Sequence, residues 1–327
     1  MNSAYFRDVL RDFRLFLYPS RLIFCLSRFA KTCEVNEIDL TREQLRLLTF
    51  VERINFTVVH WLNRSRWLSR PLLWLQSHFS RWWVELASSK TVRDHGFENF
   101  ARLDPGRGVL LVANHRTFYD QFVIAARLFT LYGSHHHICF PVRANFFYDS
   151  PLALPVNLLV SFGVMYPPII RDKKRLRWNK FATDLLVELL KDPGNMVGFH
   201  PEGTRNRGPN PYELLPAKPG CGELIYRARP NVVPVFLQGF PASPLKMFRA
   251  NWRASASDKP FVHMVMGEPM TFEKELQMEE SKKTFLLISR KVMQRIAELG
   301  EVEREIRSRV ETQAVTREPA AHVSVKS

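Results

Sequence analysis

The chain has 327 residues, of which 46% are hydrophobic and 24% are charged, so it can form one large domain or two small ones with a buried core. This composition excludes collagen, a coiled coil and a wholly disordered chain. Lysine and arginine number 47 against 32 acidic residues, giving a formal net charge of +15. Such a surface binds anions: nucleic acid, membrane head groups or phosphorylated substrates. The positive charges lie among tryptophan, leucine and phenylalanine, which favours a lipid surface over nucleic acid.

The cysteines and the N-terminus indicate where the protein works. No CxxC pair occurs among the four cysteines at positions 25, 33, 139 and 221, which indicates a reduced, cytosol-facing protein without disulfides or a cysteine-based zinc site. Arginine and aspartate interrupt every apolar stretch of residues 1–28, so we expect no secretory signal. We therefore expect a peripheral or monotopic protein on the cytoplasmic face of a membrane.

Residues 1–95 are expected to form amphipathic helices at the membrane interface. Thr41 to Gln44 has the form of a capping box, and apolar residues then recur at helical spacing, which predicts one helix over 42–62. A second short helix is expected over 72–82. Tryptophan and arginine occur close together in residues 53–83, a combination that suits a bilayer interface. The alternative is that both helices pack on the body of the protein, with the tryptophans at 61, 67, 74, 82 and 83 as core residues.

The charge-free stretch 150–170 is long enough to span a bilayer, but it is rich in proline. Because proline interrupts a helix, we expect a helix followed by a buried strand, with the turn near Gly163.

Short apolar runs alternate with helical segments over residues 96–270. This pattern predicts an α/β layered domain with a mostly parallel central sheet flanked by helices. The expected helices are 119–131, 176–190 and 220–229, and the expected strands are 109–113, 138–142, 164–170, 196–200, 232–237 and 261–266. C-terminal helices are expected over 271–311 and a flexible tail over 312–327.

Reactive side chains follow two of these strands. After the first, a turn carries His115, and Asp120 opens the next helix. The loop can fold back so that Asp120 holds one imidazole nitrogen while the other faces a substrate, which makes a general-base pair. A surface histidine beside a capping aspartate is the ordinary alternative. After strand 196–200, Gly203 allows close backbone approach, and Thr204, Arg205 and Arg207 are donors suited to phosphate.

In their order along the chain, these motifs closely resemble the glycerolipid acyltransferase superfamily, whose best known members are 1-acylglycerol-3-phosphate acyltransferases. The resemblance covers roughly residues 95–270. It is carried by Asn114-His115 to Asp120, Phe162-Gly163 to Arg171, Pro201 to Arg205, and Val232 to Val235. The family commonly has phenylalanine before the proline of the third motif, where this chain has His200.

The resemblance implies roles for individual residues. His115 would remove a proton from the acceptor hydroxyl as that oxygen attacks a thioester, with Asp120 holding the ring and without an acyl-enzyme. Arg171 and Arg205 would hold the acceptor phosphate. The substrate-binding residues implied are Asn114, Arg171, Glu202, Gly203, Thr204 and Arg205.

The function implied is that of an O-acyltransferase in phospholipid biosynthesis. It would move a fatty acyl group from acyl-CoA or acyl carrier protein to the free hydroxyl of a lysophospholipid, above all 1-acylglycerol 3-phosphate, giving phosphatidate. Alternatives are another acceptor, such as glycerol 3-phosphate, another lysophospholipid or an aminolipid, or a basic membrane-binding or nucleic-acid-binding protein without catalysis. We expect no cofactor and no nucleic-acid partner.

Two further clusters of basic side chains occur in the sequence. The basic run from Arg171 to Lys180 suits the acceptor phosphate, the phosphates of the donor or anionic lipid, or it is a solvated helix face. His135, His136 and His137 are consecutive and cannot all face one ion, so we expect a polar loop and no metal.

Overall fold

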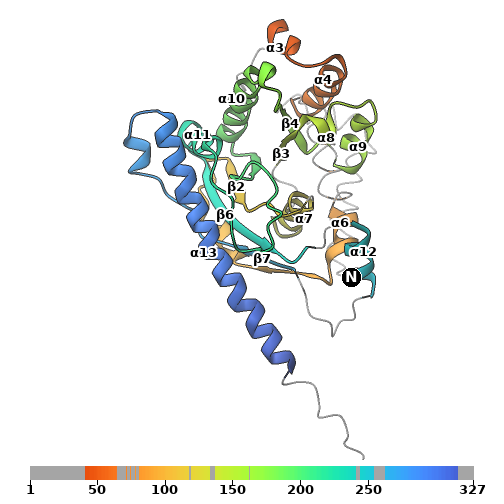
Figure 1. Cartoon of the computed structure of the whole chain (residues 1–327), viewed down its shortest axis with the longest axis vertical. Helices are drawn as coiled ribbons and strands as arrows, with labels where there is room; N and C mark the ends of the chain where they lie inside the picture. Colours follow the sequence, from red (N-terminus) through yellow and green to blue (C-terminus); the bar gives the residue numbers. More distant parts are fainter. Residues whose placement is uncertain are drawn as a thin grey trace, which may run out of the picture. The chain divides into compact units, whose positions relative to one another are not determined.

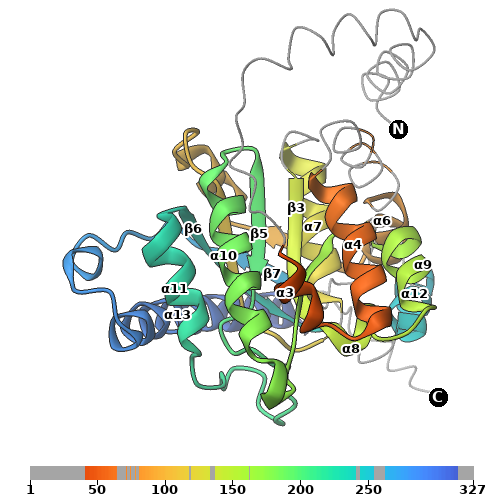
Figure 2. The same cartoon turned by 90° about the horizontal axis from the view of Figure 1, so that it is seen from above.

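The computed structural model describes residues 41–64, 71, 74, 78, 81–117, 119–132, 137–161, 163–240, 244–253 and 262–315. Within these ranges seven strands form one sheet in the order β1-β7-β6-β2-β5-β3-β4 (Figures 1 and 2). The strands are β1 (Val92–His95), β2 (Val109–Ala113), β3 (His137–Arg143), β4 (Met165–Ile169), β5 (Asn195–Phe199), β6 (Asn231–Gln238) and β7 (Val262–Met266).

The sheet is mostly parallel, as the sequence predicts. Strand β2 lies at its centre and pairs in parallel with β5 on one side and β6 on the other, while β6 and β7 pair in antiparallel. Every residue of β2 is buried. A strand that is covered on both faces is expected to be a continuous apolar run, as this one is. All six strands expected from the sequence are present.

The main helices around the sheet are α7 (Asp120–Tyr132), α9 (Ala153–Val160), α10 (Arg177–Lys191), α11 (Pro219–Ala228), α12 (Pro244–Arg253) and α13 (Lys282–Val315). Helix α10 packs on β4 and β5, and α13 packs on β6, β7 and α11. In both views α11 and α13 lie on one side of the domain, whereas α6 (Arg81–Ser88), α9 and α12 lie on the other (Figures 1 and 2).

The helix expected over 42–62 is in fact two helices, α3 (Arg42–Arg46) and α4 (Phe50–Arg64). A capping box begins α4 at Thr49 and Glu52: the Thr49 N–H donates to the Glu52 carboxylate at 2.8 Å, and the Glu52 N–H donates to Thr49 Oγ1 at 3.3 Å. The buried Glu52 carboxylate also pairs with Arg175, which fixes the start of α4 to the segment after β4.

An aromatic cluster anchors α4 to the sheet. Phe56 is fully buried and meets the Trp178 ring edge-on, with centroids 4.8 Å apart. Trp178 in turn donates its indole N–H to Pro168 O at 2.7 Å. Truncating a buried aromatic of this kind costs about 3–5 kcal/mol. Helix α4 therefore belongs to the same packed unit as the sheet.

The boundaries of the expected segments shift accordingly. Strand β1 was not expected, and because it pairs with β7 from Val92 to His95, the sheet begins before residue 96. Helix α13 continues to Val315, past the expected end at 311. Residues 1–40, the tryptophan at 67 and residues 316–327 lie outside the described ranges.

The stretch 150–170 forms α9 and then β4, with Gly163 at a φ of 73° between them, as predicted. None of the helices described combines the length and the low charge that crossing a bilayer requires.

Candidate active site

The candidate site lies where the central parallel strands end. Strand β2 leads into His115 and strand β5 leads into His200 and the Pro201–Arg205 motif. Because β2 and β5 are hydrogen-bonded neighbours running in the same direction, their carboxyl ends bring the two motifs together.

His115 and Asp120 form the pair that the sequence predicts. The distance from His115 Nδ1 to Asp120 Oδ2 is 3.0 Å. The same carboxylate accepts the N–H groups of Arg116 at 2.8 Å and Thr117 at 2.9 Å, and the Thr117 hydroxyl at 2.5 Å. An ionised carboxylate accepts only, so Nδ1 carries the proton and Nε2 is left as the base.

The charge on Asp120 is held by these bonds. Burial alone would raise the pKa of this carboxyl, but the hydrogen bonds and charge of His115, with the Thr117 hydroxyl, hold it below its ordinary value. The His115 side chain keeps 17% of its surface exposed, whereas that of Asp120 keeps 1%. The geometry thus suits a base that is open to substrate and an orienting group that is closed to water.

His200 covers one face of His115. The two rings are stacked with centroids 4.0 Å apart and an angle of 10° between them. His200 Nδ1 lies 2.9 Å from Ala113 O and donates to it, and burial lowers the pKa of His200 to about 3. Its Nε2 is buried without a hydrogen-bond partner among the described residues. His200 is therefore a neutral ring that supports the base.

The backbone of His115 is clamped by the third motif. Its N–H donates to Glu202 Oε1 at 2.9 Å, and its carbonyl accepts the Asn206 N–H at 2.7 Å. The other Glu202 oxygen accepts the Leu215 N–H at 2.9 Å. Burial raises the pKa of Glu202, whereas the hydrogen bonds from these two N–H groups favour its ionised form. Glu202 shapes the site rather than facing solvent.

Two arginines meet at the turn formed by Gly203 and Thr204. Gly203 has a φ of +68°, a left-handed conformation that favours glycine. Its carbonyl accepts from Arg171 Nη2 at 2.6 Å, and Thr204 Oγ1 accepts from Arg143 Nη2 at 2.8 Å. The predicted residues Arg171, Gly203 and Thr204 are therefore brought together.

Arg143, at the end of β3, was missed by the sequence analysis. Burial, and then the positive charges of Arg171, Arg205 and Arg207, lower its pKa, so these guanidinium groups share one positive region. Arg205 also lies over the Phe146 ring, 6.0 Å from its centroid. The signal that could have found Arg143 is its position as a cation at the carboxyl end of a parallel strand.

Asn114 is buried and is bonded to the neighbouring strand β6. Its amide N–H donates to Leu237 O at 2.9 Å, and its amide oxygen accepts the Leu237 N–H at 2.8 Å. The side chain is 1% exposed. Both its polar groups tie the end of β2 to the end of β6, and the expected contact of Asn114 with substrate stays a prediction.

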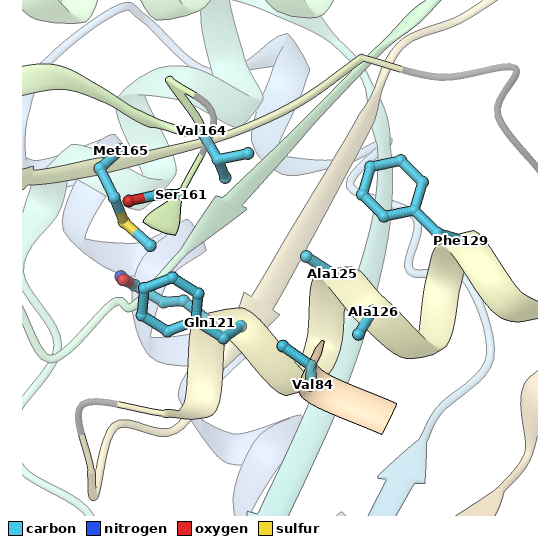
Figure 3. Close-up of a pocket in the computed structure, with 9 residues that line it drawn as sticks. Val84, Gln121, Ala125, Ala126, Phe129, Ser161, Val164 and Met165 are labelled. Atoms are coloured by element: carbon cyan, nitrogen blue, oxygen red, sulfur yellow. The ribbon is translucent and has the colours of Figure 1, made fainter. Parts of the chain in front are cut away.

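A small apolar pocket lies behind the site, between α6, α7 and the segment before β4. In Figure 3 the side chains of Gln121, Ala125 and Phe129 on α7 line it opposite Val164 and Met165. Its volume is about 20 Å³, which suits a water molecule and is too small for a fatty acyl chain. The Ser161 hydroxyl in its wall is buried without a partner among the described residues.

No group of three histidine, cysteine, aspartate or glutamate side chains that could hold a metal ion occurs in the described part of the chain. Of the histidine triplet, His137 begins β3 and is buried, which lowers its pKa to about 4. His135 and His136 lie outside the described ranges, so the polar loop expected there stays a prediction.

Comparison with known proteins identifies the domain. Residues 91–238 match the family model described as Acyltransferase. This span is an acyltransferase domain. The protein is therefore an acyltransferase enzyme, and the His115–Asp120 pair and the Pro201–Arg205 motif lie within the matched acyltransferase residues.

Among solved structures, the acyltransferase is similar to the 1-acyl-sn-glycerophosphate (LPA) acyltransferase PlsC from Thermotoga maritima. The two chains are 17% identical, and the match covers 79% of this chain and 95% of that one, with a TM-score of 0.42. No curated protein sequence matches the chain.

Proposed function

We propose that this acyltransferase moves a fatty acyl group from a thioester, acyl-CoA or acyl carrier protein, to the free hydroxyl of a lysophospholipid. The preferred acceptor is 1-acylglycerol 3-phosphate, and the product is phosphatidate. One observation carries the proposal: a histidine–aspartate pair and a cluster of arginines occupy the same edge of the sheet. A base alone serves many reactions, but a base beside guanidinium groups that pair with no carboxylate among the described residues suits a hydroxyl on a phosphorylated molecule.

The proton and the acyl group move in one cycle. His115 Nε2 takes the proton from the acceptor hydroxyl while that oxygen attacks the thioester carbonyl carbon. Asp120 stabilises the imidazolium that forms. When the tetrahedral intermediate collapses, the carbon–sulfur bond breaks, and the imidazolium gives its proton to the departing thiolate. The enzyme ends as it began, and the acyl group has passed from sulfur to oxygen.

Direct transfer is favoured over a covalent acyl-enzyme. Both cysteines that the structure describes, Cys139 and Cys221, are buried, and burial raises the pKa of Cys139 to about 12 and that of Cys221 further. A thiol held protonated in this way is a poor nucleophile. The Thr117 hydroxyl, closest to the pair, donates to Asp120 and is committed there.

The acceptor phosphate would bind at Arg143 and Arg171, with Arg205 nearby. In 1-acylglycerol 3-phosphate the phosphate is bonded to the carbon next to the one that bears the free hydroxyl. The phosphate site must therefore lie close to His115. The turn at Gly203 and Thr204 meets this requirement, because it directly follows Glu202, which is bonded to the His115 backbone.

We also propose that the enzyme works on the cytoplasm-facing surface of a membrane as a peripheral protein. Large apolar side chains are exposed on helices of one side of the domain, and we term them the apolar face: Phe50, Ile54 and Trp61 of α4, Trp82 and Leu86 of α6, Leu152 and Val156 at α9, and Trp252 of α12. Exposed tryptophan with neighbouring lysine and arginine, such as Lys246, Arg249 and Arg253 of α12, suits an anionic lipid surface.

A thiol-release assay on the purified protein tests the proposal. Acyl-CoA and acyl carrier protein donors are paired with a panel of acceptors that includes 1-acylglycerol 3-phosphate, glycerol 3-phosphate, lysophosphatidylcholine and an aminolipid. We expect thiol release to depend on 1-acylglycerol 3-phosphate and to yield phosphatidate. Release that requires an acceptor without a phosphate monoester would sink the assignment of the arginines, and release without any acceptor would point to a thioesterase.

A further inference from the structure

The loop of residues 206–218, which follows the third motif, holds the backbone of His115, and we term it the clamp loop. At its start the Asn206 N–H donates to His115 O at 2.7 Å. Farther along, the Leu215 N–H donates to one oxygen of Glu202, whose other oxygen accepts the His115 N–H. The position of the His115 backbone, and with it the imidazole, therefore depends on the shape of this loop.

Tyr212 lies within the clamp loop and is held by three groups outside it. Its ring stacks on Phe236 of β6, with centroids 5.8 Å apart and an angle of 6° between the rings. The guanidinium carbon of Arg304 lies 4.2 Å from the centroid of the Tyr212 ring. The Tyr212 hydroxyl donates to Glu303 Oε2 at 2.7 Å. Arg304 and Glu303 both belong to α13, so this helix holds the clamp loop from outside the active site.

Glu303 is a charged group at a position closed to water. Its side chain is 0% exposed, and its other carboxylate oxygen pairs with Arg307. Burial, and then the hydrogen bond to Glu303, raise the pKa of Tyr212, so the phenol stays protonated and remains a donor. Burying an ion pair is costly, and well-packed apolar side chains often hold two elements together equally well. What a carboxylate adds is a bond of defined length and direction to Tyr212.

Helix α13 has other attachments to the domain. The Gly222 N–H of α11 donates to Ser289 Oγ at 2.8 Å. Three of its apolar residues are buried: Val292, Ile296 and Leu299. With these anchors in place, the bond between Tyr212 and Glu303 serves the clamp loop more than the attachment of the helix. Glu303 also lies beyond residue 238, where the match to the acyltransferase family ends.

We propose that Glu303 and Tyr212 are positioning residues for acyl transfer: α13 fixes the clamp loop through their hydrogen bond, and the clamp loop fixes His115. They act through the loop and not on the substrate. A general base must be aligned with the proton that it removes, so a small displacement of His115 lowers the rate. This inference rests on the proposed function, in which His115 is the base.

The variant Tyr212→Phe tests the link, because it keeps the ring and its stacking and removes only the hydroxyl. We expect kcat to fall about tenfold. The KM for the acceptor should stay within about threefold, because the arginines proposed to bind phosphate are bonded to Gly203 and Thr204, ahead of the clamp loop. Glu303→Gln keeps an oxygen that accepts the Tyr212 hydroxyl, so its kcat should stay within about threefold of the native value.

The matched control is Tyr226→Phe. It removes the hydroxyl that donates from α11 to Met278 O at 2.8 Å, a bond that does not involve the clamp loop. We expect this variant to keep the native kcat. Urea unfolding of each variant measures the loss of stability separately, so a fall in kcat can be compared with a general weakening of the fold.

Amide hydrogen exchange, followed by mass spectrometry, gives a readout that does not depend on turnover. We expect faster exchange over residues 206–215 in Tyr212→Phe and native exchange there in Tyr226→Phe. A native kcat in Tyr212→Phe, with or without faster exchange, would overturn the inference and leave the proposed function standing. Transfer only to an acceptor other than a lysophospholipid, slowed about tenfold by Tyr212→Phe, would do the reverse.

Discussion

The imidazole rings of His115 and His200 lie nearly parallel, 4.0 Å apart between centroids, and they reach this arrangement from the ends of two neighbouring strands. Asp120 fixes the His115 ring along its edge, and His200 fixes it across its face. A general base must hold its lone pair on the substrate proton, so both supports bear on the rate.

The flat shape of His200 should matter more than its nitrogens. Its pKa of about 3 keeps it neutral at working pH, so it supplies no charge to the reaction. We expect His200→Phe to keep kcat within about threefold and His200→Ala to lower it about 10- to 100-fold, with the KM for the acceptor unchanged in both. Steady-state kinetics of the two variants check this. An equal and large loss in both would show that a nitrogen of His200 is required.

Loss of the base itself should be far more damaging. We expect His115→Ala to lower kcat by about two to four orders of magnitude, the usual contribution of a general base. In the described part of the chain the His115 side chain hydrogen-bonds to Asp120 alone, so the fold should survive, and the far-ultraviolet circular dichroism of the variant serves as its control. Near-normal transfer by this variant would refute the mechanism.

The sequence predicts a feature well when the residues that form it are close together along the chain. The pairing of His115 with Asp120 was predicted because the two residues are five positions apart in one strand–turn–helix segment. The buried strands were predicted because each is a nearly continuous apolar run. Strand β1 was missed because Val92-Arg-Asp-His95 has one aliphatic residue, and its strand character depends on pairing with β7.

Long-range contacts decided the features that were missed. The capping box at Thr49 and Glu52 was not predicted, and the Glu52 carboxylate also pairs with Arg175, 123 residues away along the chain. Arg143 meets Thr204 across 61 residues. Asn114 was expected to bind substrate, but its amide bonds to Leu237 on a neighbouring strand. No local pattern contains these partners.

The Arg143–Arg171 cluster gives a prediction about the acceptor. We expect Arg143→Ala and Arg171→Ala each to raise the KM for 1-acylglycerol 3-phosphate by about 10- to 100-fold, since each removes a charged donor to phosphate. The KM for acyl-CoA should stay within about twofold. Initial rates at varied acceptor concentration check this, with Arg290→Ala as the control for loss of one positive charge. A rise confined to the donor KM would contradict the assignment of Arg143 and Arg171 to the acceptor phosphate.

Buried neutral histidines predict acid sensitivity. Burial lowers the pKa of His137 to about 4 and that of His200 to about 3, against an ordinary value of 6.5. Both take up a proton on unfolding below pH 6.5, so the free energy of unfolding is undiminished above that pH and falls as the pH drops toward 4. The expected slope is at most about 1.4 kcal/mol per pH unit for each of these two histidines.

Urea unfolding at pH 7, 6 and 5, followed by tryptophan fluorescence, measures this slope. His200→Phe removes one of the groups and should make the slope shallower, although it leaves the Ala113 carbonyl without its donor. Asp120 acts in a lower range: its lowered pKa adds stability that is lost only when that carboxylate is protonated, below about pH 4. Stability independent of pH between 7 and 5 would contradict the buried neutral state of both histidines.

The apolar face predicts how the protein meets a bilayer. Leu152 at the start of α9 is 75% exposed, and Trp252 of α12 is 71% exposed. Moving an exposed apolar side chain from water into the head-group region is favourable by about 25 cal/mol for each Å² removed from water. We expect the native protein to float with vesicles that contain phosphatidylglycerol, and Leu152→Glu to reduce the bound fraction several-fold.

The chain offers a matched control for this substitution. Leu287 is also an exposed leucine, at 43%, but it lies on α13, on the other side of the domain from α9 and α12 in both views (Figures 1 and 2). Leu287→Glu introduces the same charge and should leave flotation unchanged. Raising the salt from 0.1 M to 1 M shortens the Debye length from about 10 Å to 3 Å and should weaken the binding that the basic residues of α12 supply. Equal loss with Leu152→Glu and Leu287→Glu would mean that net charge, rather than the apolar face, governs the attachment.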